Sequence, residues 1–177
     1  METIIIEKRY KNDSFTQEAM DGLKWCLKAR SKDATRPIIN HILVDDSLVI
    51  ATDGSRVHLF LLTDITLPNG EYEIAAVNAK QIILRKLDET SFPDYMRVMP
   101  PVNFGTSVRC KDKHTPLYHA IYNQFANDIR TYDTDLICDA FMANSTVSIC
   151  SGDGCAAPLV LYDNNCRGAI VMPVRNK

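Results

Sequence analysis

The sequence lacks the features that mark membrane and secreted proteins. No apolar run approaches the length of a membrane span, and Ile4-Ile5-Ile6 is too short for the hydrophobic core of a signal peptide. The six cysteines include no Cys-x-x-Cys pair. Cys26 and Cys138 fall within apolar helical patterns, where cysteine acts as a small hydrophobic residue. We therefore expect a cytoplasmic protein with reduced thiols and no contact with a membrane.

An excess of charge of one sign is also missing. The chain carries 20 Lys and Arg against 22 Asp and Glu, a net charge of -2. A dedicated nucleic-acid binder often shows an overall basic balance or a basic patch, so any DNA contact here would need a local basic face. The 177 residues, 46% hydrophobic and 24% charged, are sufficient for a soluble globular domain with a sizeable core.

Signatures of catalysis and of bound metals are weak. His114 and His119 are five residues apart, which is not the spacing of a zinc-protease helix. Cys150 and Cys155 have poor spacing for a zinc ligand set, and a turn between buried thiols explains them. The sequence predicts no enzyme, no metal and no cofactor, with a structural zinc site as the remote alternative.

Apolar patterns predict a mixed α+β chain with antiparallel sheets. Ser14 and Gln17 have the spacing of a helix capping box, and Asp133 or Thr134 would cap a later helix. Asp53-Gly54 is a hairpin turn signal between two apolar runs. Helices are predicted at 14–29, 78–87, 116–129 and 135–142. Strands are predicted at 3–8, 38–44, 47–52, 56–63, 71–77, 106–110, 146–151, 158–162 and 167–174.

Three stretches of the chain together resemble the bacterial DNA polymerase sliding clamp, the beta subunit of DNA polymerase III. They are the Thr52-Asp53-Gly54-Ser55-Arg56 hairpin, the Phe92–Pro100 segment (FPDYMRVMP), and Met172-Pro173-Val174-Arg175 near the C-terminus. They occur in the order found in that family, whose subunit is longer and has several domains. The resemblance therefore implies a reduced relative with a DNA-clamp-like fold.

The resemblance also implies how the chain is organised. The clamp fold repeats a βαβββ unit, and two such units would form a single clamp-like domain over residues 1–177. The first unit would span about 1–67 and the second about 71–177, with a connecting insertion at about 88–132.

In the clamp family these motifs converge on one surface cleft that binds short peptides of polymerases and other clients. Aliphatic residues would hold a client's Leu or Phe, and arginines would hold carbonyls or carboxylates at the rim. The alternative is that the aliphatic residues form the core and the arginines are solvated. Ser55 stands where many members carry histidine. The residues carried over are Ile39, Thr52, Gly54, Arg56, Val57, Pro93, Arg97, Val98, Ile170, Met172, Pro173, Val174 and Arg175.

The family also presents basic helix residues to the phosphates of duplex DNA. Such contacts would be independent of base sequence and sensitive to salt. A solvated face of mixed charge is the alternative, because Glu18 and Asp21 lie close by in the sequence. The DNA-binding residues implied are Lys24, Lys28, Arg30, Lys32, Lys80 and Arg85.

The sequence as a whole thus predicts a sliding-clamp-like DNA replication accessory protein. Its expected partners are peptides of DNA polymerase or other clamp clients, with double-stranded DNA and further copies of the chain as additional candidates. The alternative is a stand-alone protein-interaction module that keeps the peptide cleft and does not encircle DNA.

Overall fold

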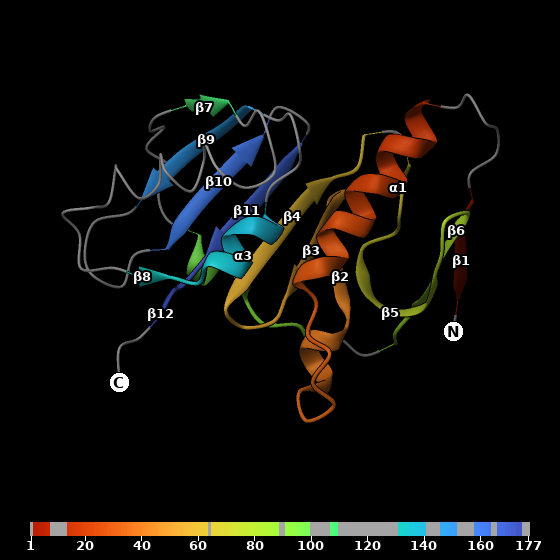
Figure 1. The fold of residues 1–177 in the computed structure, drawn as a ribbon. Helices are drawn as coiled ribbons and strands as arrows, with labels where there is room; N and C mark the ends of the chain where they lie inside the picture. Colours follow the sequence, from red (N-terminus) through yellow and green to blue (C-terminus); the bar gives the residue numbers. More distant parts are fainter. Residues whose placement is uncertain are drawn as a thin grey trace. The chain divides into compact units, whose positions relative to one another are not determined.

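The computed structural model describes residues 2–7, 14–63, 65–88, 91–99, 107–109, 131–140, 146–151, 158–163 and 166–174. It divides the chain into two compact units, Met1–Asp94 and Tyr95–Lys177. Each unit has antiparallel strands and at least one helix (Figure 1). Within the described residues, no helix is long and apolar enough to cross a membrane.

The first unit is an antiparallel sheet with the strand order β1-β6-β5-β2-β3-β4. Helix α1 lies against β3 and β4 (Figure 1). The strands are β1 (Thr3–Glu7), β2 (Ile42–Asp45), β3 (Leu48–Thr52), β4 (Arg56–Leu61), β5 (Gly70–Val77) and β6 (Gln81–Lys86). The helices are α1 (Ser14–Cys26) and the 3-10 turns η1 (Leu27–Ala29) and η2 (Pro37–Asn40).

One apolar stripe of α1 forms the core with the sheet. Met20, Leu23 and Cys26 recur at helical spacing, and all three are buried. Gly22 lies on the same helix, and a Cβ placed there would be 2.2 Å from the ring of Phe60 on β4. Glycine therefore permits the close approach of helix and sheet. Each fully buried Leu or Met side chain contributes about 1.5–3 kcal/mol.

The second unit contains the strand order β11-β10-β9-β7 and a separate pair, β12-β8. Asp133 caps its helix α3 (Thr134–Asp139), because the carboxylate accepts from the backbone N–H of Asp135 and Leu136. The other elements are η3 (Tyr95–Val98), β7 (Ser107–Arg109), β8 (Thr131–Tyr132), β9 (Thr146–Ser151), β10 (Leu159–Asp163), β11 (Arg167–Val171) and β12 (Pro173–Val174).

The predicted α+β class with antiparallel strands is confirmed, but one predicted helix is wrong. Residues 78–87 contain strand β6, which lies between β1 and β5. Ile82 and Leu84 are buried, whereas Gln81 and Arg85 on the same strand are not. The Asn78 side chain accepts from the N–H of Lys80 and Gln81, so it closes a turn where a helix start was expected.

Other sequence predictions differ in smaller ways. The strand predicted at 38–44 begins only at Ile42, because Pro37 starts a 3-10 turn before it. The helix predicted at 116–129 lies outside the described residues, as does most of the predicted insertion at 88–132. Strands β5 and β6 belong to the sheet of the first compact unit. The proposed division into two βαβββ units stays a prediction.

Candidate functional site

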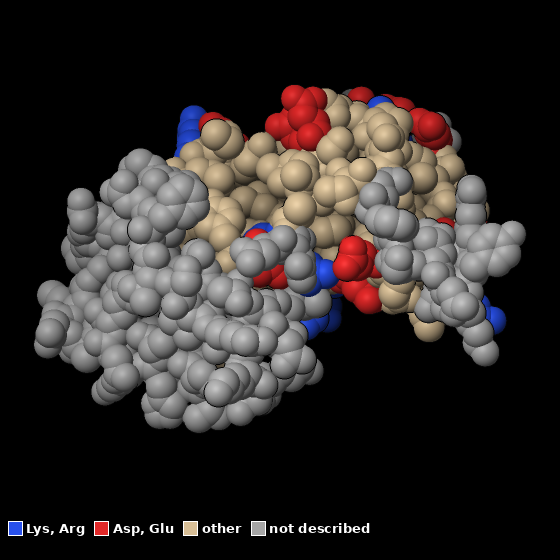
Figure 2. Space-filling view, turned by 90° about the horizontal axis from the view of Figure 1, so that it is seen from above, with Lys and Arg blue, Asp and Glu red and all other residues tan. Residues whose placement is uncertain are grey.

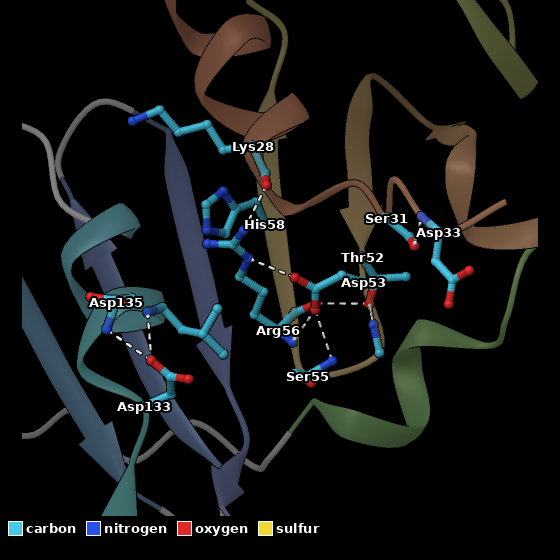
Figure 3. A network of polar contacts seen from close by, with 12 residues as sticks. Lys28, Ser31, Asp33, Thr52, Asp53, Ser55, Arg56, His58, Asp133 and Asp135 are labelled. Carbon is cyan, nitrogen blue, oxygen red and sulfur yellow. Dashed lines mark hydrogen bonds and ion pairs between the residues drawn. The ribbon is translucent and has the colours of Figure 1, made fainter. Parts of the chain in front are cut away.

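The hairpin between β3 and β4 is held by hydrogen bonds among its own residues (Figure 3). The Asp53 carboxylate accepts from the backbone N–H of Ser55 at 2.9 Å and of Arg56 at 3.1 Å. The Thr52 hydroxyl donates to the Arg56 carbonyl at 2.7 Å and accepts from the Gly54 N–H at 3.0 Å. Gly54 has a φ of +91°, which an L side chain rarely adopts. The turn is therefore fixed before any ligand binds.

Arg56 links this hairpin to the end of the α1 region. Its Nε donates to Asp53 Oδ2 at 3.0 Å, and its Nη2 donates to the Lys28 carbonyl at 2.7 Å (Figure 3). Only 8% of the residue is exposed. A guanidinium can serve both partners because it carries several donors in a fixed plane. At least two donors of Arg56 thus serve the fold, whereas the family resemblance implies a place for Arg56 at the rim of a peptide cleft.

The other predicted cleft residues of the first unit differ in exposure. Ile39 and Val57 are buried with the core, as the alternative interpretation of the sequence expected for aliphatic residues. Thr52 is also buried, and its hydroxyl is occupied by the hairpin. Pro93 is exposed. The aliphatic residues on either side of the turn are buried, whereas Asp53 and Ser55, which flank Gly54, are more accessible.

The predicted cleft residues of the second unit pass from core to surface along the chain. Every residue of β11 is buried, including Ile170 at 0% exposure. Met172 and Pro173 are half-buried, and Val174 is 50% exposed. Strand β12 pairs with β8 through Pro173 and Val174. We call Met172-Pro173-Val174 the apolar C-terminal segment.

The remaining residues of the predicted cleft either belong to the second unit or lie outside the described residues. Val98 is half-buried and Arg97 is exposed in η3. Arg175 lies outside the described residues. The predicted cleft residues from Ile39 to Pro93 belong to the first compact unit, and those from Arg97 onward belong to the second. That all these residues border one groove stays a prediction.

The predicted DNA-binding residues do not lie on a pair of helices as expected. Lys24 lies in α1, and Lys28 in η1 is exposed, as is Lys32 in the loop that follows. Arg30 is half-buried and donates to the Asn40 carbonyl at 3.4 Å. Lys80 lies in the β5–β6 turn and Arg85 on β6, where it pairs with Glu73 at 3.8 Å. On the face shown in Figure 2, acidic and basic side chains of the described residues are interspersed.

Sequence reasoning missed a buried carboxylate at Glu71 in β5. Only 1% of Glu71 is exposed, and its Oε1 accepts from the backbone N–H of Ser91 and Phe92. A glutamate next to a tyrosine in an alternating strand pattern gives no signal of such a role. In the described part of the chain, no group of three or more His, Cys, Asp or Glu side chains could hold a metal.

The arrangement of the described strands and helices is that of the DNA clamps. The chain is similar to the DNA polymerase III beta chain of Streptococcus pneumoniae, with 13% identity and a TM-score of 0.59 over 99% of this chain and 65% of that one. It is also similar to the beta subunit of Borrelia burgdorferi in complex with a natural product, with 10% identity, a TM-score of 0.57, and coverage of 100% and 65%.

A third similar structure is the Helicobacter pylori beta clamp bound to a DNA ligase peptide. It shares 10% identity with this chain and has a TM-score of 0.53, with coverage of 89% of this chain and 63% of that clamp. No family model and no curated protein matches the sequence. The resemblance of the three sequence motifs to bacterial sliding clamps is thus confirmed at the level of the fold, and the chain spans less than two thirds of the length of these clamps.

Proposed function

We propose that this protein is a cytoplasmic, non-enzymatic replication accessory that binds short peptides of DNA polymerase or other clamp clients. The observation that carries the proposal is the apolar C-terminal segment, which leaves the buried strand β11 and reaches the surface at Val174. The chain has a clamp-like fold, and three of its stretches resemble motifs of the sliding-clamp peptide site. One clamp of similar fold is bound to a DNA ligase peptide.

The chemistry of the segment suits leucine and phenylalanine side chains. Met172 has a flexible thioether that adapts to different apolar shapes. Pro173 and Val174 are rigid and lose little conformational entropy when a ligand covers them. Fully burying one client side chain is worth about 1.5–3 kcal/mol, and association costs offset much of that sum. We therefore expect a dissociation constant on the order of micromolar.

The test is a titration of a labelled peptide with a glutamine followed by leucine and a terminal Leu-Phe pair. Val174→Asp should weaken binding by at least about tenfold, because it places a charge in an apolar contact. Val77→Asp is a matched control, since Val77 is 45% exposed, ends strand β5 and is absent from the predicted site. If wild type does not saturate, or both variants lose binding equally, the proposed function is wrong.

A second candidate is a stand-alone peptide-binding module that does not encircle DNA. The pairing of Arg85 with Glu73 at 3.8 Å favours it, because this pair neutralises one of the cations assigned to DNA binding. A ring built from these 177 residues would require several copies. Sedimentation of the purified protein separates this module from a clamp that forms a ring, because a monomer that binds peptide cannot close around a duplex.

A further inference from the structure

The buried carboxylate of Glu71 is the starting point for an inference that rests on the proposed peptide-binding function. Glu71 lies in β5, which has neighbours on both sides in the sheet, β2 and β6. A buried carboxylate is costly unless hydrogen bonds or opposite charges compensate for its lost hydration. The partners of Glu71 therefore indicate what this glutamate does.

Those partners belong to the chain that follows β6. The Glu71 carbonyl accepts from the Leu87 N–H at 2.9 Å. Its side-chain Oε1 accepts from the N–H of Ser91 and, at 2.5 Å, from that of Phe92. The second oxygen, Oε2, lies 3.9 Å from His41 Nδ1. One residue of the sheet thus holds the chain both where it leaves β6 and where the Phe92–Pro100 segment begins.

The position of these hydrogen bonds matters for the residues that follow. Phe92 precedes Pro93, so its backbone is restricted to extended conformations. Pro93 has a fixed φ and no N–H through which the sheet could hold it. The N–H groups of Ser91 and Phe92 are therefore the last donors before Pro93, and Glu71 accepts from both. The carboxylate therefore holds the backbone immediately before Pro93 to strand β5.

We propose that Glu71 is a positioning residue for peptide binding. It contacts no peptide itself and acts through the backbone of Ser91 and Phe92, which fixes Pro93 at the start of the Phe92–Pro100 segment. A segment that is already ordered loses less conformational entropy when the peptide binds. The tether, defined as Glu71 with the N–H groups of Ser91 and Phe92, thus sets affinity through pre-organisation.

Three variants of the full chain separate this role from a purely structural one. Glu71→Leu keeps the approximate volume and removes the acceptor, whereas Glu71→Gln keeps an oxygen that accepts from both N–H groups. Glu73→Ala is the matched control, because it removes a glutamate of the same strand whose side chain is 47% exposed and pairs with Arg85. Amide hydrogen exchange at Ser91 and Phe92 and the affinity for the labelled peptide are measured for each protein.

We expect Glu71→Leu to exchange both amides faster and to bind the peptide about tenfold more weakly. Glu71→Gln should restore most of both properties, and Glu73→Ala should change neither. Peptide affinity in Glu71→Leu equal to that of wild type, with faster exchange, would overturn the proposal. A Glu71→Gln variant that binds the peptide as weakly as Glu71→Leu would also overturn the proposal.

The wild type alone provides a further measurement that does not depend on how the variants fold. Coupling is reciprocal, so a tether that favours peptide binding must itself be stabilised by bound peptide. Saturating peptide should slow exchange at Ser91 and Phe92, and unchanged exchange overturns the proposal. If wild type binds no peptide, the proposed function fails with it, and faster exchange in Glu71→Leu then identifies the tether as a structural device only.

Discussion

The guanidinium of Arg56 donates a 2.7 Å hydrogen bond to the backbone carbonyl of Lys28, 28 residues earlier in the chain. The same guanidinium pairs with Asp53, which also accepts the Arg56 N–H. A related pair occurs in the second unit. Arg167 donates its N–H to Asp163 at 3.1 Å, and the two side chains pair at 3.6 Å. Each unit thus joins two consecutive strands through a largely buried aspartate and arginine.

Arg56 is expected to stabilise the fold strongly. Hydrogen bonds to charged groups contribute about 1.5–3 kcal/mol each, so Arg56→Ala should lower the free energy of unfolding by roughly 3 kcal/mol. Arg36→Ala is the control, because the exposed pair of Arg36 with Asp33 at 3.9 Å should contribute less than about 1 kcal/mol. Urea unfolding measures both, and equal losses would contradict the role of Arg56.

Gly22 is expected to be intolerant of even a methyl group. Alanine has a better helix propensity by about 1 kcal/mol, but its Cβ would collide with the ring of Phe60. Overpacking costs about 1–3 kcal/mol, so Gly22→Ala should lower the melting temperature. Combining it with Phe60→Leu should recover part of that loss. A Gly22→Ala protein that melts higher than wild type would show that helix and sheet separate easily.

How far the sequence predicts this fold depends on whether the deciding contacts are local. The Asp53-Gly54 turn was predicted because its hydrogen bonds and its positive φ lie within a few residues. The apolar run Ile82-Ile83-Leu84 has no helical or strand period that decides between the two structures. It forms a strand because β1 and β5 supply hydrogen-bond partners from distant parts of the chain.

At the candidate site, too, contacts between residues distant in the sequence could not be predicted. The exposure of Val174 and the burial of Ile170 could not be distinguished from their residue types, since both are aliphatic residues in one predicted strand. The resemblance to the sliding-clamp motif implies a place for Arg56 at a cleft rim, whereas its partner in the fold, the Lys28 carbonyl, carries no sequence signal. Glu71 was missed for the same reason, because it binds backbone groups 20 and 21 residues away.

Cys26 is expected to make stability depend on alkaline pH. Burial raises the pKa of its thiol above the ordinary value of 9.0, and a backbone hydrogen bond at Ala51 lowers it only in part. The thiol of the unfolded chain therefore loses its proton above about pH 9, whereas the folded thiol keeps it. The free energy of unfolding keeps its full value below that pH and falls above it. The slope is at most about 1.4 kcal/mol per pH unit. Urea unfolding between pH 8 and pH 10 should show a steeper decline for wild type than for Cys26→Ala.

Duplex DNA is expected to bind weakly, without preference for base sequence, and with a strong dependence on salt. Lys28 and Lys32 are both exposed after α1, whereas Lys80 lies in the β5–β6 turn that was wrongly predicted to be helical. Each lost phosphate contact should reduce the slope of log affinity against log salt by about 0.9. Fluorescence anisotropy should therefore show a smaller slope for Lys28→Glu than for Lys80→Glu. Binding that persists at high salt, or equal effects of the two substitutions, would argue against a DNA-facing surface at the end of α1.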